Sequence, residues 1–392
     1  MITKKKIIIL GFMGGCPIAG VIWQHLHYII GLQRLGHDVY YVEDTVNFPY
    51  NPSTFDISDD YTYGASTVAT LAKEYNFQWA YCARYKDPFE IVGMRHAELL
   101  ELYRTCDAAL NVCGSHDFYE DLASVNNLIY VESDPGVEQI KIDQGREETI
   151  SFLKKHHHLF TFGEAIGTPS FPVPLHDFHW LPTRQPIVTD LWCSTLEAPP
   201  PAQEALYTSV CNWSTSGKKD ILWHDSTYLW SKSLEFLKFL QAPRKCGETF
   251  ELATEINNQE EKNLFINNHW RLILPHDLSV NWRSYKDYIC SSRGEFTCAK
   301  DQYVRLKTGW FSDRSACYLA AGRPVITQET GFSHLYGDGI GLIGFSTMEE
   351  IVEAARSIRT DYKKHSQAAL QIAREYFEAE KVLSSLLERA GV

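Results

Sequence analysis

The segment that most constrains the fold of this chain is residues 309–329, with the sequence GWFSDRSACYLAAGRPVITQE. A polar loop is followed by residues of good helix propensity (316–321), by Gly322 and, two positions later, by a proline. Glycine commonly ends a helix in the left-handed conformation, and the proline cannot continue the helix. The segment therefore predicts a short helix that opens at Ser312 or at the residue after it and leads into a buried strand.

The start of this helix has the features of a phosphate-binding site. Its first turn leaves backbone N–H groups without intrahelical partners, and the helix dipole favours negative charge there. Two hydroxyls, a carboxylate and a guanidinium lie at the same place, from Ser312, Asp313, Arg314 and Ser315. We expect these four residues to hold a phosphate group.

Alternation of strand and helix patterns predicts an α/β fold with parallel sheets. In the first half, strand patterns cover residues 6–10, 38–42, 108–112 and 128–131, and helical patterns cover 21–35, 66–74 and 88–104. After a proline-rich stretch at 171–201, strand patterns return at 208–211, 250–253, 270–274, 291–298 and 325–327, and helical patterns at 227–240, 282–289, 348–359 and 365–390. A chain of 392 residues is long enough for two domains.

We predict a domain at residues 1–185, a linker at 186–203, a second domain at 204–370, and a helix at 371–392 that packs back onto the first domain. Ligands in such sheets bind outside the carboxyl ends of the strands, so residues at those ends are the strongest site candidates.

Composition limits the partners and the compartment. The formal net charge is −12, which argues against binding to nucleic acid or to an anionic membrane surface. No window holds the roughly 18 apolar residues that a transmembrane helix needs. The ten cysteines form no CxxC pair, which is typical of a reducing, cytoplasmic protein. Three adjacent histidines at 156–158 cannot all face one ion, so we predict no metal site.

Loops of the first half carry the candidates for proton transfer. The glycine-rich loop at 11–20 does not have the GxGxxG spacing, so it is either a tight turn without a ligand or a wall of the acceptor site lined by Gly14 and Gly15. His25 follows it in a helix, where it reaches the cleft or is simply buried. Candidate catalytic residues after later strands are His116, Asp117 and Asp134, and helix capping is an equally good interpretation of the two aspartates.

Two loops of the second half carry further candidates for ligand binding. Trp213 follows a strand and could stack on a base or shape the cleft. Arg293, Glu295 and Lys300 lie close together before the segment 309–329, where the cations could neutralise a diphosphate and the carboxylate could bind ribose hydroxyls. A structural cluster of ion pairs is the alternative.

These motifs, in this order, resemble the GT-B glycosyltransferases, and more specifically bacterial family 1-like glycosyltransferases. The matching segments are GGCP at 14–17, LGHDV at 35–39, SRGEF at 292–296, GWFSDRS at 309–315 and AAGRPVI at 320–326, which together span most of the chain. The resemblance implies two Rossmann-like domains facing across a cleft and transfer of a sugar from a nucleoside diphosphate sugar to an acceptor hydroxyl or amine. It also implies that residues 312–315 hold the donor diphosphate, that Glu329 contacts the donor sugar, and that no cofactor or metal is needed.

The chain departs from the family pattern at both usual catalytic positions. Retaining members often carry two glutamates where this sequence has Gly309 and Cys317, and many inverting members carry a histidine where it has Gly15, Cys16 and Pro17. Two alternatives therefore stay open: a non-catalytic nucleotide-sugar-binding partner protein, and a sugar-nucleotide epimerase on the same fold.

Overall fold

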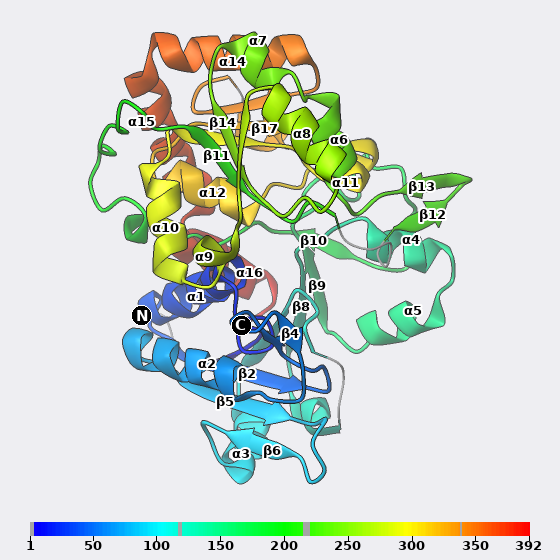
Figure 1. Cartoon of the computed structure of the whole chain (residues 1–392). Coiled ribbons are helices and arrows are strands. Elements are labelled where there is room, and N and C mark those ends of the chain that lie inside the picture. The colour runs from blue at the N-terminus through cyan, green and yellow to red at the C-terminus, as the bar shows by residue number, and fades with distance from the viewer. Residues whose placement is uncertain (1–3, 117–119, 215–219, 338) are drawn as a thin grey trace.

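The computed structural model describes residues 4–116, 120–214, 220–337 and 339–392, and its first sheet has eight strands (Figure 1). Their order is β10-β9-β8-β7-β1-β2-β5-β6. The bounds are β1 Lys6–Leu10, β2 Asp38–Thr45, β5 Gln78–Ala83, β6 Glu90–Val92, β7 Ala108–Val112, β8 Leu128–Glu132, β9 His158–Thr161 and β10 Trp180–Pro182. All neighbours are parallel except β6, which pairs antiparallel with β5 at the edge of the sheet.

The second sheet has six parallel strands in the order β15-β14-β11-β16-β17-β18. The bounds are β11 Tyr207–Val210, β14 Phe250–Ala253, β15 Trp270–Ile273, β16 Gly294–Thr297, β17 Val325–Gln328 and β18 Leu342–Phe345. Two small antiparallel pairs join β3 (Tyr50–Asn51) to β4 (Asp56–Ile57) and β12 (Ile221–Trp223) to β13 (Ser226–Tyr228).

Helices connect successive parallel strands, because a parallel pair needs a crossover. In the first half they are α1 Ala19–Arg34, α2 Thr62–Tyr75, α3 His96–Thr105, α4 Val137–Asp143 and α5 Glu147–Leu153, with 3₁₀ turns at Glu120–Ser124 and Thr189–Leu191. In the second half they are α6 Ser233–Lys238, α7 Ala242–Cys246, α8 Gln259–Asn267, α9 His276–Ser279, α10 Trp282–Ser291, α11 Asp301–Leu306, α12 Asp313–Ala320, α13 Ser333–Tyr336, α14 Met348–Thr360, α15 Tyr362–Ile372, a π turn at Ala373–Phe377, and α16 Ala379–Arg389. The predicted α/β class with two Rossmann-like sheets is confirmed, and the domain bounds stay a prediction.

Three predicted helices differ from the structure. The pattern at 88–104 forms strand β6 and then α3, and the pattern at 227–240 contributes to β13 before α6 begins at Ser233. The pattern at 365–390 is interrupted at Glu378, whose backbone is extended (φ −54°, ψ 123°). Pairing outweighs helix propensity at these places: β6 and β13 pair with the strand that precedes each in sequence, and Glu378 pairs with the distant Ile187.

The C-terminal helix crosses back onto the first half, as predicted. Around the break, the Ile187 N–H donates to the Phe377 carbonyl (2.7 Å) and the Ala379 N–H donates to the Ile187 carbonyl (2.8 Å). Helix α16 then lies against α1, the red and blue helices near the middle of Figure 1. The two backbones approach closely at Gly31, where a Cβ would lie 2.6 Å from Leu383 Cδ1 and 2.8 Å from the Ala379 Cβ.

Each sheet has one point where the winding direction of the chain reverses. In the first sheet this point lies between β1 and β7, and in the second it lies between β11 and β16. Loops on either side of such a point diverge and leave a crevice at the carboxyl ends of the strands. The residues that follow these four strands are therefore where the fold itself places a ligand.

The contact between α1 and α16 yields the first prediction. We expect Gly31→Ala to lower the free energy of unfolding by about 1–3 kcal/mol, because the added methyl group overlaps α16. The control is Gly20→Ala on the same helix, where a Cβ would have no atom within 4 Å; it should be neutral or stabilising by up to about 1 kcal/mol. Equal effects of the two substitutions in urea unfolding would contradict the close packing of α16.

Candidate functional site

Two adjoining cavities lie at the reversal points of the sheets. The first, which we call the α12 cavity, has a volume of about 320 Å³ and is lined by α1, the end of β11 and the start of α12. The second, which we call the glycine-loop cavity, has a volume of about 470 Å³ and is lined by the loops after β1, β7 and β8 and by Trp310. Gln24 and Asp313 line both cavities. The two cavities therefore meet where α1 faces the first turn of α12.

Arg314 fixes the start of α12 to the second sheet. Its guanidinium donates to Glu295 Oε1 (2.6 Å), to the Val210 carbonyl (2.7 Å) and to Thr297 Oγ1 (2.9 Å). Burial tends to lower the pKa of Arg314, but the carboxylate of Glu295 outweighs it and the pKa is raised. These contacts use three of the five donors of a guanidinium. Arg314 also lines the α12 cavity.

Lys232 is a second cation near Arg314, although it lines neither cavity. It immediately precedes α6, its exposure is only 8%, and its ammonium lies 5.8 Å from the centre of the Trp310 ring. No carboxylate within the described ranges forms an ion pair with it. Burial, together with the charge of Arg314, lowers the pKa of Lys232 to about 8. A buried cation without a partner is costly, and an anionic ligand would remove that cost.

Lys300 and Asp134 connect the two halves of the chain. Lys300 Nζ lies 2.5 Å from Asp134 Oδ1, which also accepts a hydrogen bond from the Tyr303 hydroxyl. The same ammonium lies 3.3 Å from the centre of the Trp230 ring. The predicted catalytic residue Asp134 thus lines the glycine-loop cavity as one partner of an ion pair.

The other residues predicted at the helix start lie close to Arg314. Ser312 is the N-cap of α12, and its side chain makes no capping hydrogen bond, which leaves the helix N-terminus open. Ser315 Oγ is buried without a hydrogen-bond partner. Burial and the charge of Asp134 raise the pKa of Asp313 to about 7. Glu329 follows β17 and accepts a hydrogen bond from the Gly331 N–H.

Of the predicted donor-binding residues, Ser312, Asp313 and Arg314 line the cavities, whereas Trp213, Arg293 and Glu329 do not. Trp213 is 5% exposed, stacks edge-on against Phe265 and donates to Glu261, so its ring belongs to the core and is not free to stack on a base. Arg293 precedes β16 and therefore lies at the amino end of the second sheet, where it contacts Tyr362. Ligands of such sheets bind at the carboxyl ends of the strands, so a residue that precedes a strand, as Arg293 does, lies at the opposite end of the sheet.

The glycine loop is held by Glu43 at the carboxyl end of β2. Its carboxylate accepts hydrogen bonds from the N–H groups of Gly14 and Gly15, the latter at 2.8 Å, and from the Tyr41 hydroxyl at 2.6 Å. Burial raises the pKa of Glu43 to about 7, against the opposing effect of these three donors. Gly15 and Glu43 both line the glycine-loop cavity, so the loop forms part of its wall.

The two predicted histidines are buried below this wall. His25 is fully buried beside Gly11, and its Nδ1–H donates to the Val21 carbonyl (2.8 Å). Burial lowers the pKa of His25 to about 4. His25 Nε2 has no hydrogen-bond partner among the described residues.

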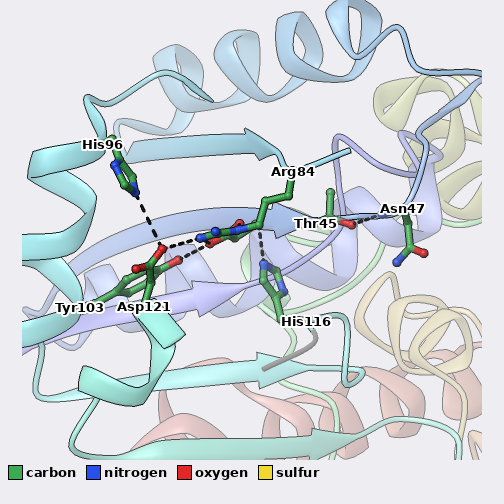
Figure 2. A network of polar contacts seen from close by, with 8 residues as sticks. Thr45, Asn47, Arg84, His96, Tyr103, His116 and Asp121 are labelled. Atoms are coloured by element: carbon green, nitrogen blue, oxygen red, sulfur yellow. Dashed lines mark hydrogen bonds and ion pairs between the residues drawn. The ribbon is translucent and has the colours of Figure 1, made fainter. Parts of the chain in front are cut away.

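His116 belongs to a polar network under the first sheet (Figure 2). Its Nε2 accepts the Asp44 N–H (2.8 Å), and the carboxylate of Asp44 in turn binds Arg84. Arg84 also donates to Asp121 (2.6 Å). Burial, with a contribution from His25, lowers the pKa of His116 to about 3, so the ring is neutral and engaged in supporting the strand. The neighbouring candidate Asp117 lies outside the described residues.

Sequence reasoning missed Lys232 and the role of Glu43. Lys232 was hidden because residues 227–240 have a helical pattern, whereas the structure starts α6 only at Ser233 and so leaves Lys232 at its entrance. Glu43 had a usable signal, since it lies at the carboxyl end of a predicted strand.

Within the described ranges, no group of three or more His, Cys, Asp or Glu side chains could hold a metal ion. The same residues include no helix with the length and apolar character that crossing a bilayer requires.

The raised pKa of Glu43 leads to a prediction about stability and pH. Folding favours the protonated form between the ordinary pKa of 4.5 and the folded value of about 7, so the free energy of unfolding falls as pH rises through this window. Glu43→Gln cannot titrate. We expect its destabilisation relative to the wild type to be largest near pH 5 and to shrink by about 2–3 kcal/mol by pH 8.

The check is urea unfolding of both proteins from pH 5 to pH 8. Other buried carboxyl groups are present in both proteins and cancel in the difference. A difference that is constant, or that grows with pH, would contradict the assigned shift.

Comparison with solved structures identifies the fold. An alpha-glucosyltransferase solved with UDP and a 13-mer DNA containing an HMU base is similar at a TM-score of 0.60 and 12% identity, over 99% of this chain and 100% of that chain. Alr3699/HepE from Anabaena, solved with UDP, is similar at 0.56 and 11%, over 99% and 100%. Sucrose-phosphate synthase from Thermosynechococcus elongatus is similar at 0.51 and 9%, over 98% of each chain. No protein-family model and no curated protein matches the sequence. The resemblance inferred from the motifs thus agrees with the structure: along nearly its whole length, the chain has the GT-B fold of these glycosyltransferases.

Proposed function

We propose that this chain is an enzyme that transfers a sugar from a nucleoside diphosphate sugar to an acceptor hydroxyl or amine. The observation that carries the proposal is the buried Lys232 near the start of α12. Lys232 immediately precedes α6, lies near Arg314 and forms no ion pair with a described residue, and the N-cap of α12, Ser312, makes no side-chain capping hydrogen bond. A diphosphate supplies the missing negative charge and accepts hydrogen bonds from the free N–H groups.

The fold supports the same interpretation. The cations follow the reversal point of the second sheet, where α/β proteins bind ligands. HepE, which shares the fold, has been solved with UDP and with UDP-glucose. We infer that the donor diphosphate of this protein lies in the α12 cavity, with its sugar directed toward the glycine-loop cavity.

In the transfer, the bond from the sugar to the diphosphate breaks and a bond to the acceptor forms. Charge builds up on the departing diphosphate, and Lys232, Arg314 and the N-terminus of α12 would stabilise it without a metal ion. The acceptor loses a proton. Asp313 lines both cavities, whereas Asp134 is engaged by Lys300 and Tyr303, so we infer that Asp313 takes that proton.

Nucleotide affinity tests the proposed role of Lys232. We expect Lys232→Met to weaken UDP binding roughly 10- to 150-fold, because a charge-assisted contact of about 1.5–3 kcal/mol is lost. Its stability should stay equal or rise, because the variant removes a buried charge without a partner. Lys245→Met, which changes an exposed lysine on α7, is the control. Unchanged UDP affinity of Lys232→Met in calorimetry would contradict the proposal that the diphosphate binds beside Lys232.

Turnover tests the enzyme itself and the role of Asp313. Incubation with a panel of nucleotide sugars should release nucleoside diphosphate, and Asp313→Asn should lower that rate by roughly 10²- to 10⁴-fold with donor affinity retained. Full activity in this variant would shift the role to Asp134. Tight nucleotide binding without turnover would instead indicate a binding protein, and appearance of an epimerised sugar would indicate an epimerase.

A further inference from the structure

The glycine-loop cavity has an unbalanced charge. Three carboxyl groups line it, from Glu43, Asp134 and Asp313, and the described residues of its lining include no lysine, arginine or histidine. Lys300 neutralises Asp134 at 2.5 Å. Glu43 and Asp313 have no ion-pair partner in the described part of the chain, so carboxyl groups outnumber cations in this cavity, whereas the lining of the adjoining α12 cavity includes Arg314 beside Asp313.

Neutral polar groups fill much of the remaining wall. Hydroxyls and amides line the cavity from Gln24, Thr45, Asn47, Ser115 and Ser133. Such groups both donate and accept hydrogen bonds, which matches the needs of a compound with many hydroxyl groups. Phe48 and Trp310 add apolar ring surface at the same place. A few oriented polar groups among apolar surface are typical of a small-molecule site.

We propose that the glycine-loop cavity receives a neutral or amine-bearing polyhydroxyl compound as acceptor and rejects anionic ones. The proposal rests on the proposed transferase function and adds the class of acceptor to it. An acceptor with a carboxylate or phosphate would face Glu43 and Asp313 in a site partly shielded from water, where like charges oppose binding. A protonated amine would meet two carboxyl groups of opposite charge.

Three disaccharides with one backbone test this preference: cellobiose, the chitosan dimer, which carries amines, and cellobiouronic acid, which carries a carboxylate. Their affinities are measured by calorimetry with and without UDP at pH 8, above the pKa of about 7 to which burial raises Glu43 and Asp313. We expect the first two to bind at least about tenfold more tightly than cellobiouronic acid. Cellobiouronic acid binding as tightly as cellobiose would overturn the proposal, and so would failure of both cellobiose and the chitosan dimer to bind at their highest soluble concentration.

Two variants test whether the charge of the cavity or its shape sets the preference among the three sugars. Asp313→Asn should reduce the preference against cellobiouronic acid several-fold, whereas Phe48→Ala should weaken all three sugars alike and keep their order. Loss of the order in Phe48→Ala, or an unchanged preference in Asp313→Asn, would contradict a charge-based choice.

The two proposals fail in different ways. If UDP does not bind but the order of the sugars holds, the transferase function fails and the charge preference of the cavity stands. If UDP binds and the order is reversed, only the proposed acceptor class fails.

Discussion

The buried ion pair between Arg314 and Glu295 is the interaction on which the site depends. The guanidinium of Arg314 also donates to the Val210 carbonyl and to Thr297, so this one side chain links the first turn of α12 to the carboxyl ends of β11 and β16. A charge buried in this way is tolerated only because its partners satisfy it. The N-terminus of α12 is thereby held at the reversal point of the sheet, where its free N–H groups and Lys232 converge.

The same region joins the two halves of the chain. Asp134 of the first half binds Lys300 of the second, and α16 returns to pack against α1 beneath the α12 cavity. Neither half alone therefore completes the cavities. Gln24 and Asp313, one from each half, line both of them. A change in the relative position of the two halves would alter the distance between the two cavities. In the proposed transfer this is the distance between the bound donor and the bound acceptor, which must be positioned for the reaction.

The two cavities differ in the charged groups that line them. Arg314 at the start of α12 lines the α12 cavity, Glu43 at the end of β2 lines the glycine-loop cavity, and Asp313 lines both. Burial raises the pKa values of Glu43 and Asp313 to about 7. The proposed roles of the two cavities, one for an anionic donor and one for a non-anionic acceptor, depend on this difference in lining charge.

The sequence by itself determined the alternation of strands and helices, the short helix from 313 to 320 and the GT-B resemblance, because periodicity, glycine and capping residues act locally. It did not separate Arg293 and Trp213, which lie away from the cavities, from the residues that line them, and it missed Lys232, since neighbours in sequence can lie at opposite ends of a strand or turn into the core. Only the tertiary structure decided which side chains share a cavity, that His116 supports a strand, and that Glu378 interrupts the last helix. Those outcomes depend on pairing between segments far apart in the chain, and local propensity carries no information about such pairing.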